Sequence, residues 1–235
     1  MKRWLAALLT LLVAAVAFAA PYTTGDTALA RLWFDTPEGR QPACTAFWID
    51  PGGPLGRQTQ PREAESLVSW LVSAGHCRAA TLVSDATDST VFGWVDWRVA
   101  VEGQGYATAW DLAIGTAPDV RGPDKRWFTL AEADPAQGQL VYVHGFPLGV
   151  EHVAAGVVEG PSTKFPGSLV VVAQTSMIAP GASGSPVMDH YGNVVGVLWG
   201  LDQDESAPNR QRLYVTPVSA LRRALDLITP KEVAS

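Results

Sequence analysis

The amino-acid sequence predicts an all-β protein built from two packed barrels and closed by one C-terminal helix. Short apolar stretches, mostly four to six residues long and rich in Val, Ile, Phe or Trp, recur between Gly, Pro and Asp residues, as antiparallel strands do. These stretches lie at 32–34, 45–49, 80–83, 91–95, 140–143, 169–173 and 194–199. They do not alternate with long amphipathic helices, so a parallel α/β sheet is not expected.

The single predicted helix lies near the C-terminus. Thr216 is suited to cap it, Pro217 fits its first position, and Pro230 would end it. The apolar residues that share one face of this helix are Val218, Leu221, Leu225 and Ile228.

The first residues predict a cleaved secretory signal over residues 1–19. Lys2 and Arg3 precede an apolar run, and Ala17-Phe18-Ala19 has the small-x-small pattern that a signal peptidase requires. A transmembrane anchor is the alternative, but such a span needs about 20 apolar residues and this run is shorter. We therefore expect cleavage after Ala19 and a secreted protein, extracellular or periplasmic, with no membrane anchor after cleavage.

The rest of the chain is long enough for two small barrels. A charged, proline-bearing segment from Gly122 to Arg126 divides it, so we expect one barrel over residues 20–122. The second barrel and the terminal helix would occupy residues 123–235. The stretch from Asp50 to Glu65 contains three prolines and several Gly, Gln and Arg residues, and it predicts a surface loop.

The charge of the chain excludes some classes of partner. The full sequence has 17 basic and 23 acidic residues, a net charge of −6, which becomes −8 without Lys2 and Arg3. An acidic chain without clusters of Lys and Arg is poorly suited to bind nucleic acid or anionic membranes. We expect neither kind of partner.

The two cysteines, Cys44 and Cys77, predict a disulfide, because an even pair in an exported protein is normally bridged. A metal site is the alternative. The sequence contains no CxxC or HExxH motif and no close cluster among its four histidines, so we expect no metal.

Three short segments carry residues suited to nucleophilic catalysis. The first is Ser73-Ala74-Gly75-His76-Cys77, in which His76 adjoins a cysteine that could fix its position. A general base must be held in one orientation, so this arrangement suits one. The alternative interpretation is that His76 is only a polar residue at the end of a strand.

The second segment is Trp110-Asp111-Leu112-Ala113-Ile114. Asp111 precedes a run that looks buried, where a carboxylate requires a partner. An exposed loop aspartate is the alternative, and Asp96 is a competing acid.

The third segment is Gly181-Ala182-Ser183-Gly184-Ser185-Pro186-Val187. Glycines on both sides of Ser183 permit a sharp turn, which can direct the amides of Gly181 and Ser183 at one point as an oxyanion hole. Ser185 precedes a proline and an apolar strand, which suits a structural role. A plain Gly/Ser-rich hairpin loop remains the alternative. The G-x-S-x-G elbow of α/β-hydrolases does not fit, because its fifth residue here is a serine and the only later histidine, His190, is too close to Ser183.

Taken in the order His76, Asp111, Ser183, these segments resemble the motifs of the chymotrypsin-like (trypsin-like) serine protease family. SAGHC resembles the histidine motif, WDLAI the aspartate motif and GASGSP the serine motif. CTAF at 44–47 resembles the strand with the partner cysteine, and VGVLWG at 195–200 resembles the strand that lines the substrate cleft. The resemblance extends from about residue 28 to 228.

The resemblance implies a fold of two packed six-stranded antiparallel barrels and a secreted serine endopeptidase acting on polypeptides. Ser183 would attack the scissile carbonyl, His76 would accept and return the proton, and Asp111 would orient the imidazole. The amides of Gly181 and Ser183 would bind the oxyanion. We expect a monomer that needs no cofactor. A catalytically silent binding protein and an esterase with the same triad remain alternatives.

Two departures from trypsin-like zymogens favour a bacterial subgroup. Ala182 stands where those zymogens have the aspartate that pairs with a new N-terminal ammonium, so the oxyanion turn should be held by packing and backbone bonds. The chain is more similar to bacterial glutamyl endopeptidases and Deg/HtrA proteases. Val197 replaces the histidine used by glutamate-specific members, which argues against glutamate preference.

The substrate pocket implied by the resemblance has no charge at its base. We therefore expect a preference for an apolar side chain before the cut bond. The residues expected to line the pocket are Met177, Ile178, Leu198, Trp199 and Gly200.

Overall fold

The computed structural model describes residues 28–49, 68–86, 92–101, 110–118, 126–174, 178–203, 207 and 209–228. The predicted signal sequence, the predicted loop at 50–65 and Met177 lie outside these residues. So does most of the predicted boundary at 122–126.

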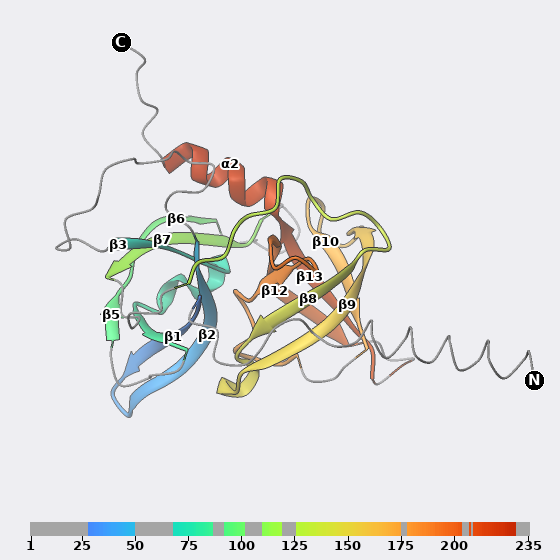
Figure 1. The fold of residues 1–235 in the computed structure, drawn as a ribbon. Helices are drawn as coiled ribbons and strands as arrows, with labels where there is room; N and C mark the ends of the chain where they lie inside the picture. The colour runs from blue at the N-terminus through green and yellow to red at the C-terminus, as the bar shows by residue number, and fades with distance from the viewer. Residues whose placement is uncertain are drawn as a thin grey trace, which may run out of the picture.

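The first half of the chain forms a seven-stranded antiparallel sheet with the order β5-β4-β1-β2-β3-β7-β6 (Figure 1). The edge strands β5 and β6 are separated only by Val95, so the sheet curls until its two edges almost meet. The strands are β1 (Leu29–Thr36), β2 (Gly39–Ile49), β3 (Val68–Ser73), β4 (Leu82–Asp85), β5 (Phe92–Trp94), β6 (Asp96–Val101) and β7 (Leu112–Pro118).

The second half forms a closed six-stranded barrel with the order β10-β13-β12-β11-β8-β9. Closure leaves no unpaired sheet edge. Its strands are β8 (Leu140–Gly145), β9 (His152–Pro161), β10 (Leu169–Ala173), β11 (Pro186–Met188), β12 (Val194–Gln203) and β13 (Gln211–Pro217).

The predicted all-β fold of two barrels is confirmed. The first barrel has seven strands where six were expected, because one strand is interrupted at Val95 and divides into β5 and β6. Counted as one bent strand, the pair restores the six-stranded arrangement. Neither β9, in which Gly156 and Gly160 interrupt the apolar pattern, nor β13 is among the strand examples named from the sequence.

The C-terminal helix α2 (Val218–Ile228) lies across both barrels and packs against strands of each (Figure 1). The predicted cap is wrong, because Thr216 and Pro217 belong to β13. The Thr216 hydroxyl instead donates to the backbone carbonyl of Asp111 over 3.3 Å. Asp134 caps the helix, accepting hydrogen bonds of 2.8 Å from the backbone N–H and the hydroxyl of Ser219.

One apolar core joins the two barrels and the helix. Phe47 of the first barrel, Val197 of the second and Leu221 of α2 are all fully buried in it. Phe47 also packs edge-on against Phe128, with ring centroids 5.8 Å apart. Because this core is continuous, it fixes the barrels relative to each other, and side chains from both can form one site.

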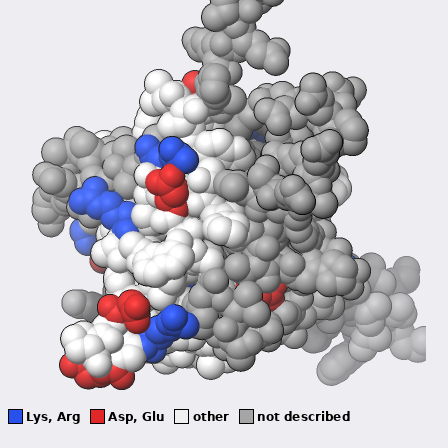
Figure 2. Space-filling model, turned by 90° about the vertical axis from the view of Figure 1, so that its left-hand side faces the viewer, with Lys and Arg blue, Asp and Glu red and all other residues white. Residues whose placement is uncertain are grey.

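The surface shown in Figure 2 carries both signs of charge, with basic side chains next to acidic ones. Two of the ion pairs on the protein surface are Arg98–Asp96 and Arg212–Glu159. No helix in the described part of the chain has both the length and the apolar character needed to cross a membrane.

Candidate active site

His76 lies in the short 3₁₀ helix η1 (Gly75–Ala79), which directly follows β3. The adjacent Cys77 is fully buried, whereas the His76 side chain is 44% exposed. Cys77 forms the predicted disulfide with Cys44 of β2. The disulfide therefore holds the turn against β2 while the imidazole faces solvent.

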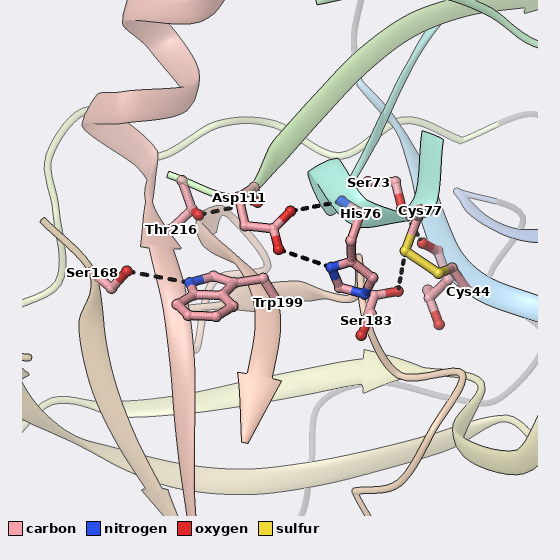
Figure 3. Close-up of polar contacts among 10 residues, drawn as sticks. Cys44, Ser73, His76, Cys77, Asp111, Ser168, Ser183, Trp199 and Thr216 are labelled. Atoms are coloured by element: carbon pink, nitrogen blue, oxygen red, sulfur yellow. Dashed lines mark hydrogen bonds and ion pairs between the residues drawn. A yellow bond between two sulfur atoms is a disulfide. The ribbon is translucent and has the colours of Figure 1, made fainter. Parts of the chain in front are cut away.

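Asp111 immediately precedes β7 and is buried, as its sequence context indicated. Both of its carboxylate oxygens accept hydrogen bonds from His76. Oδ2 lies 2.8 Å from His76 Nδ1, and Oδ1 accepts the His76 backbone N–H over 2.8 Å (Figure 3). The competing Asp96 is exposed and pairs with Arg98 at 2.7 Å. These two hydrogen bonds from His76 thus compensate the free-energy cost of burying the Asp111 carboxylate.

This contact determines which ring nitrogen of His76 carries the proton. An ionised carboxylate can only accept hydrogen bonds, so Nδ1 is the protonated nitrogen of a neutral imidazole. Nε2 is left with a free lone pair. An imidazole held in this way can act as a general base.

Ser183 lies next to the His76 ring, and the Cys44–Cys77 disulfide lies to one side of the two residues (Figure 3). Cys77 Sγ is 4.0 Å from the Ser183 carbonyl oxygen and lies within 4.8 Å of a His76 ring nitrogen. The Thr45 N–H donates to the same carbonyl over 2.9 Å. No hydrogen bond joins the Ser183 hydroxyl to His76 in the described residues. Such bonds are often long in the absence of substrate and shorten in the substrate complex.

The turn from Gly181 to Ser185 leaves two backbone amides available. The amides of Ala182, Gly184 and Ser185 donate to protein carbonyls over 2.7–3.0 Å. In the described part of the chain, the amides of Gly181 and Ser183 have no acceptor. These are the two donors that the sequence predicts for an oxyanion hole.

Glycine is required at Gly181 and Gly184, where φ is +97° and +86°. A Cβ on Gly181 would lie 2.6 Å from the carbonyl oxygen of Phe146, and one on Gly184 would collide with the carbonyl of Thr45. The turn therefore packs directly against backbone from both barrels.

Thr45 holds this turn through its side chain. Its Oγ1 donates to the Gly181 carbonyl over 2.8 Å and accepts the Phe146 N–H over 2.9 Å. The bond to Gly181 spans 136 positions in the chain. The sequence predicted that packing and backbone bonds would hold the turn, and it did not identify this hydroxyl. The available signal was a polar residue in the apolar strand 45–49, since a buried hydroxyl requires partners.

Leu148, in the 3₁₀ turn η2 (Pro147–Gly149), orients the Gly181 amide. Its N–H donates to the Pro180 carbonyl over 2.7 Å. A trans peptide directs its C=O and N–H to opposite sides, so the Gly181 N–H points away from Leu148. Leu148 has φ +53°, the one left-handed non-glycine residue in the described part of the chain, which is a conformation found at functional turns.

A pocket of about 330 Å³ adjoins Ser183. Three of the predicted lining residues, Ile178, Leu198 and Gly200, do line it, and no charged side chain does so among the described residues. Met177 lies outside the described residues. Trp199 does not line the pocket. Its indole packs against Phe165, with ring centroids 4.9 Å apart, and donates to Ser168 Oγ.

Gln211 fixes the wall of this pocket and was not identified from the sequence. Its buried side-chain amide donates to the Ile178 carbonyl over 2.9 Å and accepts the Ile178 N–H over 3.3 Å. One glutamine side chain thus replaces a missing strand partner for Ile178. Nothing in the local pattern of β13 distinguishes this glutamine from a surface residue.

A small cluster of charged and polar side chains lies next to the aromatic residues that pack against Trp199, and it does not line the pocket. Asp202 accepts hydrogen bonds of 2.6 Å from Lys164 Nζ and from the Tyr214 hydroxyl. Burial, followed by the bond to Asp202, raises the pKa of Tyr214. Burial alone would raise the pKa of Asp202, but the bonds from Lys164 and Tyr214 lower it below its usual range.

The remaining histidines do not contribute to this site. His144 is buried in β8, with Nε2 2.8 Å from Glu151 Oε1. Burial and the nearby His144 lower the pKa of His152. His190 is exposed. Among the described residues, Cys44, His76 and Cys77 are close enough together to share an ion, but both sulfurs are committed to the disulfide.

Comparison with known proteins identifies the family and the fold of the chain. Residues 44–197 match the model of the trypsin-like peptidase domain. The active form of the Rv3671c protease from M. tuberculosis is 16% identical with a TM-score of 0.59, and the alignment covers 90% of this chain and 85% of that one. A comparison with curated proteins found no match.

Two further solved structures are similar to this chain. The HtrA-type protease AlgW with a decapeptide is 17% identical with a TM-score of 0.58, and the alignment covers 90% of this chain and 65% of that one. A serine endoprotease from Yersinia pestis is 12% identical with a TM-score of 0.58, with coverage of 87% and 63%.

Two β-barrels joined by one core, with a His–Asp pair at their junction, define the chymotrypsin-like class of fold. The chain belongs to the trypsin-like peptidase family, and its enzyme class is that of a serine endopeptidase acting on polypeptides. The predicted similarity to bacterial Deg-type proteases is confirmed at the level of the fold by the HtrA-type structure.

Proposed function

We propose that this protein is an exported endopeptidase in which Ser183, His76 and Asp111 form the catalytic triad. The observation that carries the proposal is the double hydrogen bond from the buried Asp111 to His76, because it leaves Nε2 as an acceptor beside Ser183. A structural histidine would not need a buried, ionised partner and an exposed ring.

The reaction would proceed through an acyl-enzyme. His76 Nε2 removes the hydroxyl proton as Ser183 Oγ attacks the scissile carbonyl, and the resulting imidazolium gives this proton to the leaving amine. Water then enters, and the same imidazole activates it to hydrolyse the ester. Asp111 stabilises the imidazolium in both halves of the reaction.

The oxyanion of each tetrahedral intermediate would be bound by the Gly181 and Ser183 amides. Their lack of protein acceptors in the described residues supports this role, because each can donate to the substrate without breaking an existing bond. One oxyanion donor is worth about 3 kcal/mol in the transition state.

The pocket beside Ser183 supports a preference for an apolar side chain before the cut bond. Ile178, Leu198 and Gly200 offer no group that could pair with a buried charge. An Arg, Lys or Glu side chain would lose hydration without compensation. Export is supported by the Cys44–Cys77 disulfide, since disulfides persist in oxidising compartments.

The proposal is tested by incubating the purified protein with a peptide library and with casein, using Ser183→Ala as the control. We expect cleavage after apolar residues and none by the variant. Dominant cleavage after Arg, Lys or Glu would contradict the pocket assignment. Hydrolysis of short esters without any cleavage of casein would identify an esterase, and inactivity on both would favour a binding protein on the same fold.

A further inference from the structure

A second pocket, of about 270 Å³, lies on the other side of the oxyanion turn. Pro180 lines both pockets, and Gly181 lines this one together with Phe146 and Leu148. Leu148 is 75% exposed. The pocket is therefore open to solvent and directly adjoins the amide proposed to bind the oxyanion.

Arg31 is the one charged residue that lines this pocket in the described part of the chain. It lies on β1 directly opposite Thr45, so its side chain projects on the same face of the sheet as the hydroxyl that holds Gly181. Its guanidinium carbon stands 4.5 Å from the centroid of the Phe146 ring. Stacking on this ring fixes the cation beside the turn.

The charge of Arg31 has no counterion in the described part of the chain. Its Nε is buried without a hydrogen-bond partner, and no carboxylate lines the pocket. Two other arginines do have carboxylate partners: Arg98 pairs with Asp96, and Arg212 pairs with Glu159. A partly buried and unpaired guanidinium costs free energy that an anionic ligand would recover.

The position of the pocket indicates which part of a substrate could reach it. If the side chain before the cut bond enters the pocket beside Leu198, the chain after the cut bond must leave across Gly181 toward Arg31. An extended peptide advances about 3.4 Å per residue. The first two residues after the cut bond can therefore reach this pocket.

We propose that Arg31 recognises a carboxylate on the leaving-group side of the substrate, within two residues of the cut bond. This inference rests on the proposed function, because the direction of the substrate depends on Ser183 being the nucleophile. A planar guanidinium binds a carboxylate through two parallel, charge-assisted hydrogen bonds. The carboxylate can belong to an Asp or Glu side chain or to the end of a peptide chain.

The test uses peptides that are identical up to the cut bond and differ at the second residue after it. One peptide has Glu and an amidated C-terminus, a second has Gln in the same frame, and a third ends at this residue as a free acid. Comparing the Glu and Gln peptides measures the effect of a side-chain carboxylate, and the third peptide measures the effect of a terminal carboxylate. The ratio of kcat/KM between acid and neutral peptides is measured for wild type, Arg31→Met, Arg31→Lys and Arg98→Met.

We expect wild type to prefer one of the acids over Gln by a factor on the order of ten or more, the range for a charge-assisted bond. The preference should fall toward one in Arg31→Met, be intermediate in Arg31→Lys, and weaken in 0.5–1 M salt, roughly a range in which exposed charges are screened. Arg98→Met removes a surface charge away from the pocket and should keep the wild-type ratio. Equal rates on all three peptides, or a preference that survives Arg31→Met, would overturn the proposal.

Binding measurements separate this inference from the proposed function. The Ser183→Ala protein is titrated with the same peptides, with and without Arg31→Met. Tighter binding of an acid peptide that is lost with Arg31→Met supports the carboxylate site even if no peptide is cleaved. Equal binding of acid and neutral peptides refutes it, even if the protein proves to be an active protease.

Discussion

Replacing Thr45 by valine would test how the oxyanion turn is held. This chain has Ala182 at the position where trypsin-like zymogens have an aspartate that pairs with the new N-terminus, so other bonds must fix the turn. Valine keeps the shape of threonine and replaces its hydroxyl with a methyl group. The Gly181 carbonyl would then lose its donor and the buried Phe146 N–H its acceptor. The Thr45 backbone bond to Ser183 would remain.

The size of the effect follows from these two groups. An unsatisfied buried polar group costs about 1–3 kcal/mol, so we expect the two groups together to lower the free energy of unfolding of Thr45→Val by about 2–6 kcal/mol. With its carbonyl released, the turn keeps, among the described residues, only the Leu148 bond to the Pro180 carbonyl beside the Gly181 amide, so this amide can shift out of line with the oxyanion. Losing one oxyanion donor lowers kcat by about 10²–10³-fold, and we expect a loss that approaches this range.

Steady-state kinetics on one peptide substrate, together with urea denaturation, would measure both effects. KM should change little, because Thr45 does not line the pocket that takes the side chain before the cut bond. Thr45→Ser restores the hydroxyl and should recover most of kcat. If Thr45→Val retained the wild-type kcat while losing stability, Thr45 would be a structural residue only and the reasoning would be refuted.

Three further substitutions test other parts of the site. Asp111→Asn should lower kcat by about 10⁴-fold, because the side-chain amide has one accepting oxygen and cannot accept from both the Nδ1–H and the backbone N–H of His76 unless the imidazole changes its tautomer. Steady-state kinetics would measure this loss, and a loss below about tenfold would contradict the prediction. Replacing Cys44 and Cys77 together by Ala should reduce the free energy of unfolding by about 4 kcal/mol, because the disulfide closes a loop spanning 33 positions. An unchanged urea denaturation curve would argue against a bridge that constrains the unfolded chain. Gly200→Val should fold normally, since a Cβ there meets only Tyr214 at 3.7 Å, but it should raise KM for large side chains before the cut bond more than for Ala.

The fold could be predicted from the sequence because its strands carry local signals. The apolar runs at 140–143, 169–173 and 194–199 all lie within observed strands. The break at Val95 could not be predicted, since it depends on the closure of the sheet. The cap of α2 was misassigned for a similar reason: Asp134 reaches the helix from 85 positions away, and no local pattern marks it.

The same distinction applies to the site. His76 and Asp111 were identified because each lies in a short motif with its own composition, and the structure brings them together. Thr45, Gln211 and Arg31 were missed because each acts on a segment that is distant in the chain. Their partners are backbone groups, an aromatic ring and an open pocket, and the local sequence does not identify these partners, although Thr45 itself stands out as a polar residue in an apolar strand.

Covalent labelling with a fluorophosphonate, followed by peptide mass spectrometry, tests the proposed triad most directly. The wild-type protein should acquire one phosphonyl group on Ser183, and His76→Ala should acquire none at the same reagent concentration. A label on Ser185, or a folded wild-type protein that takes up no label, would contradict the assignment of Ser183 as the nucleophile.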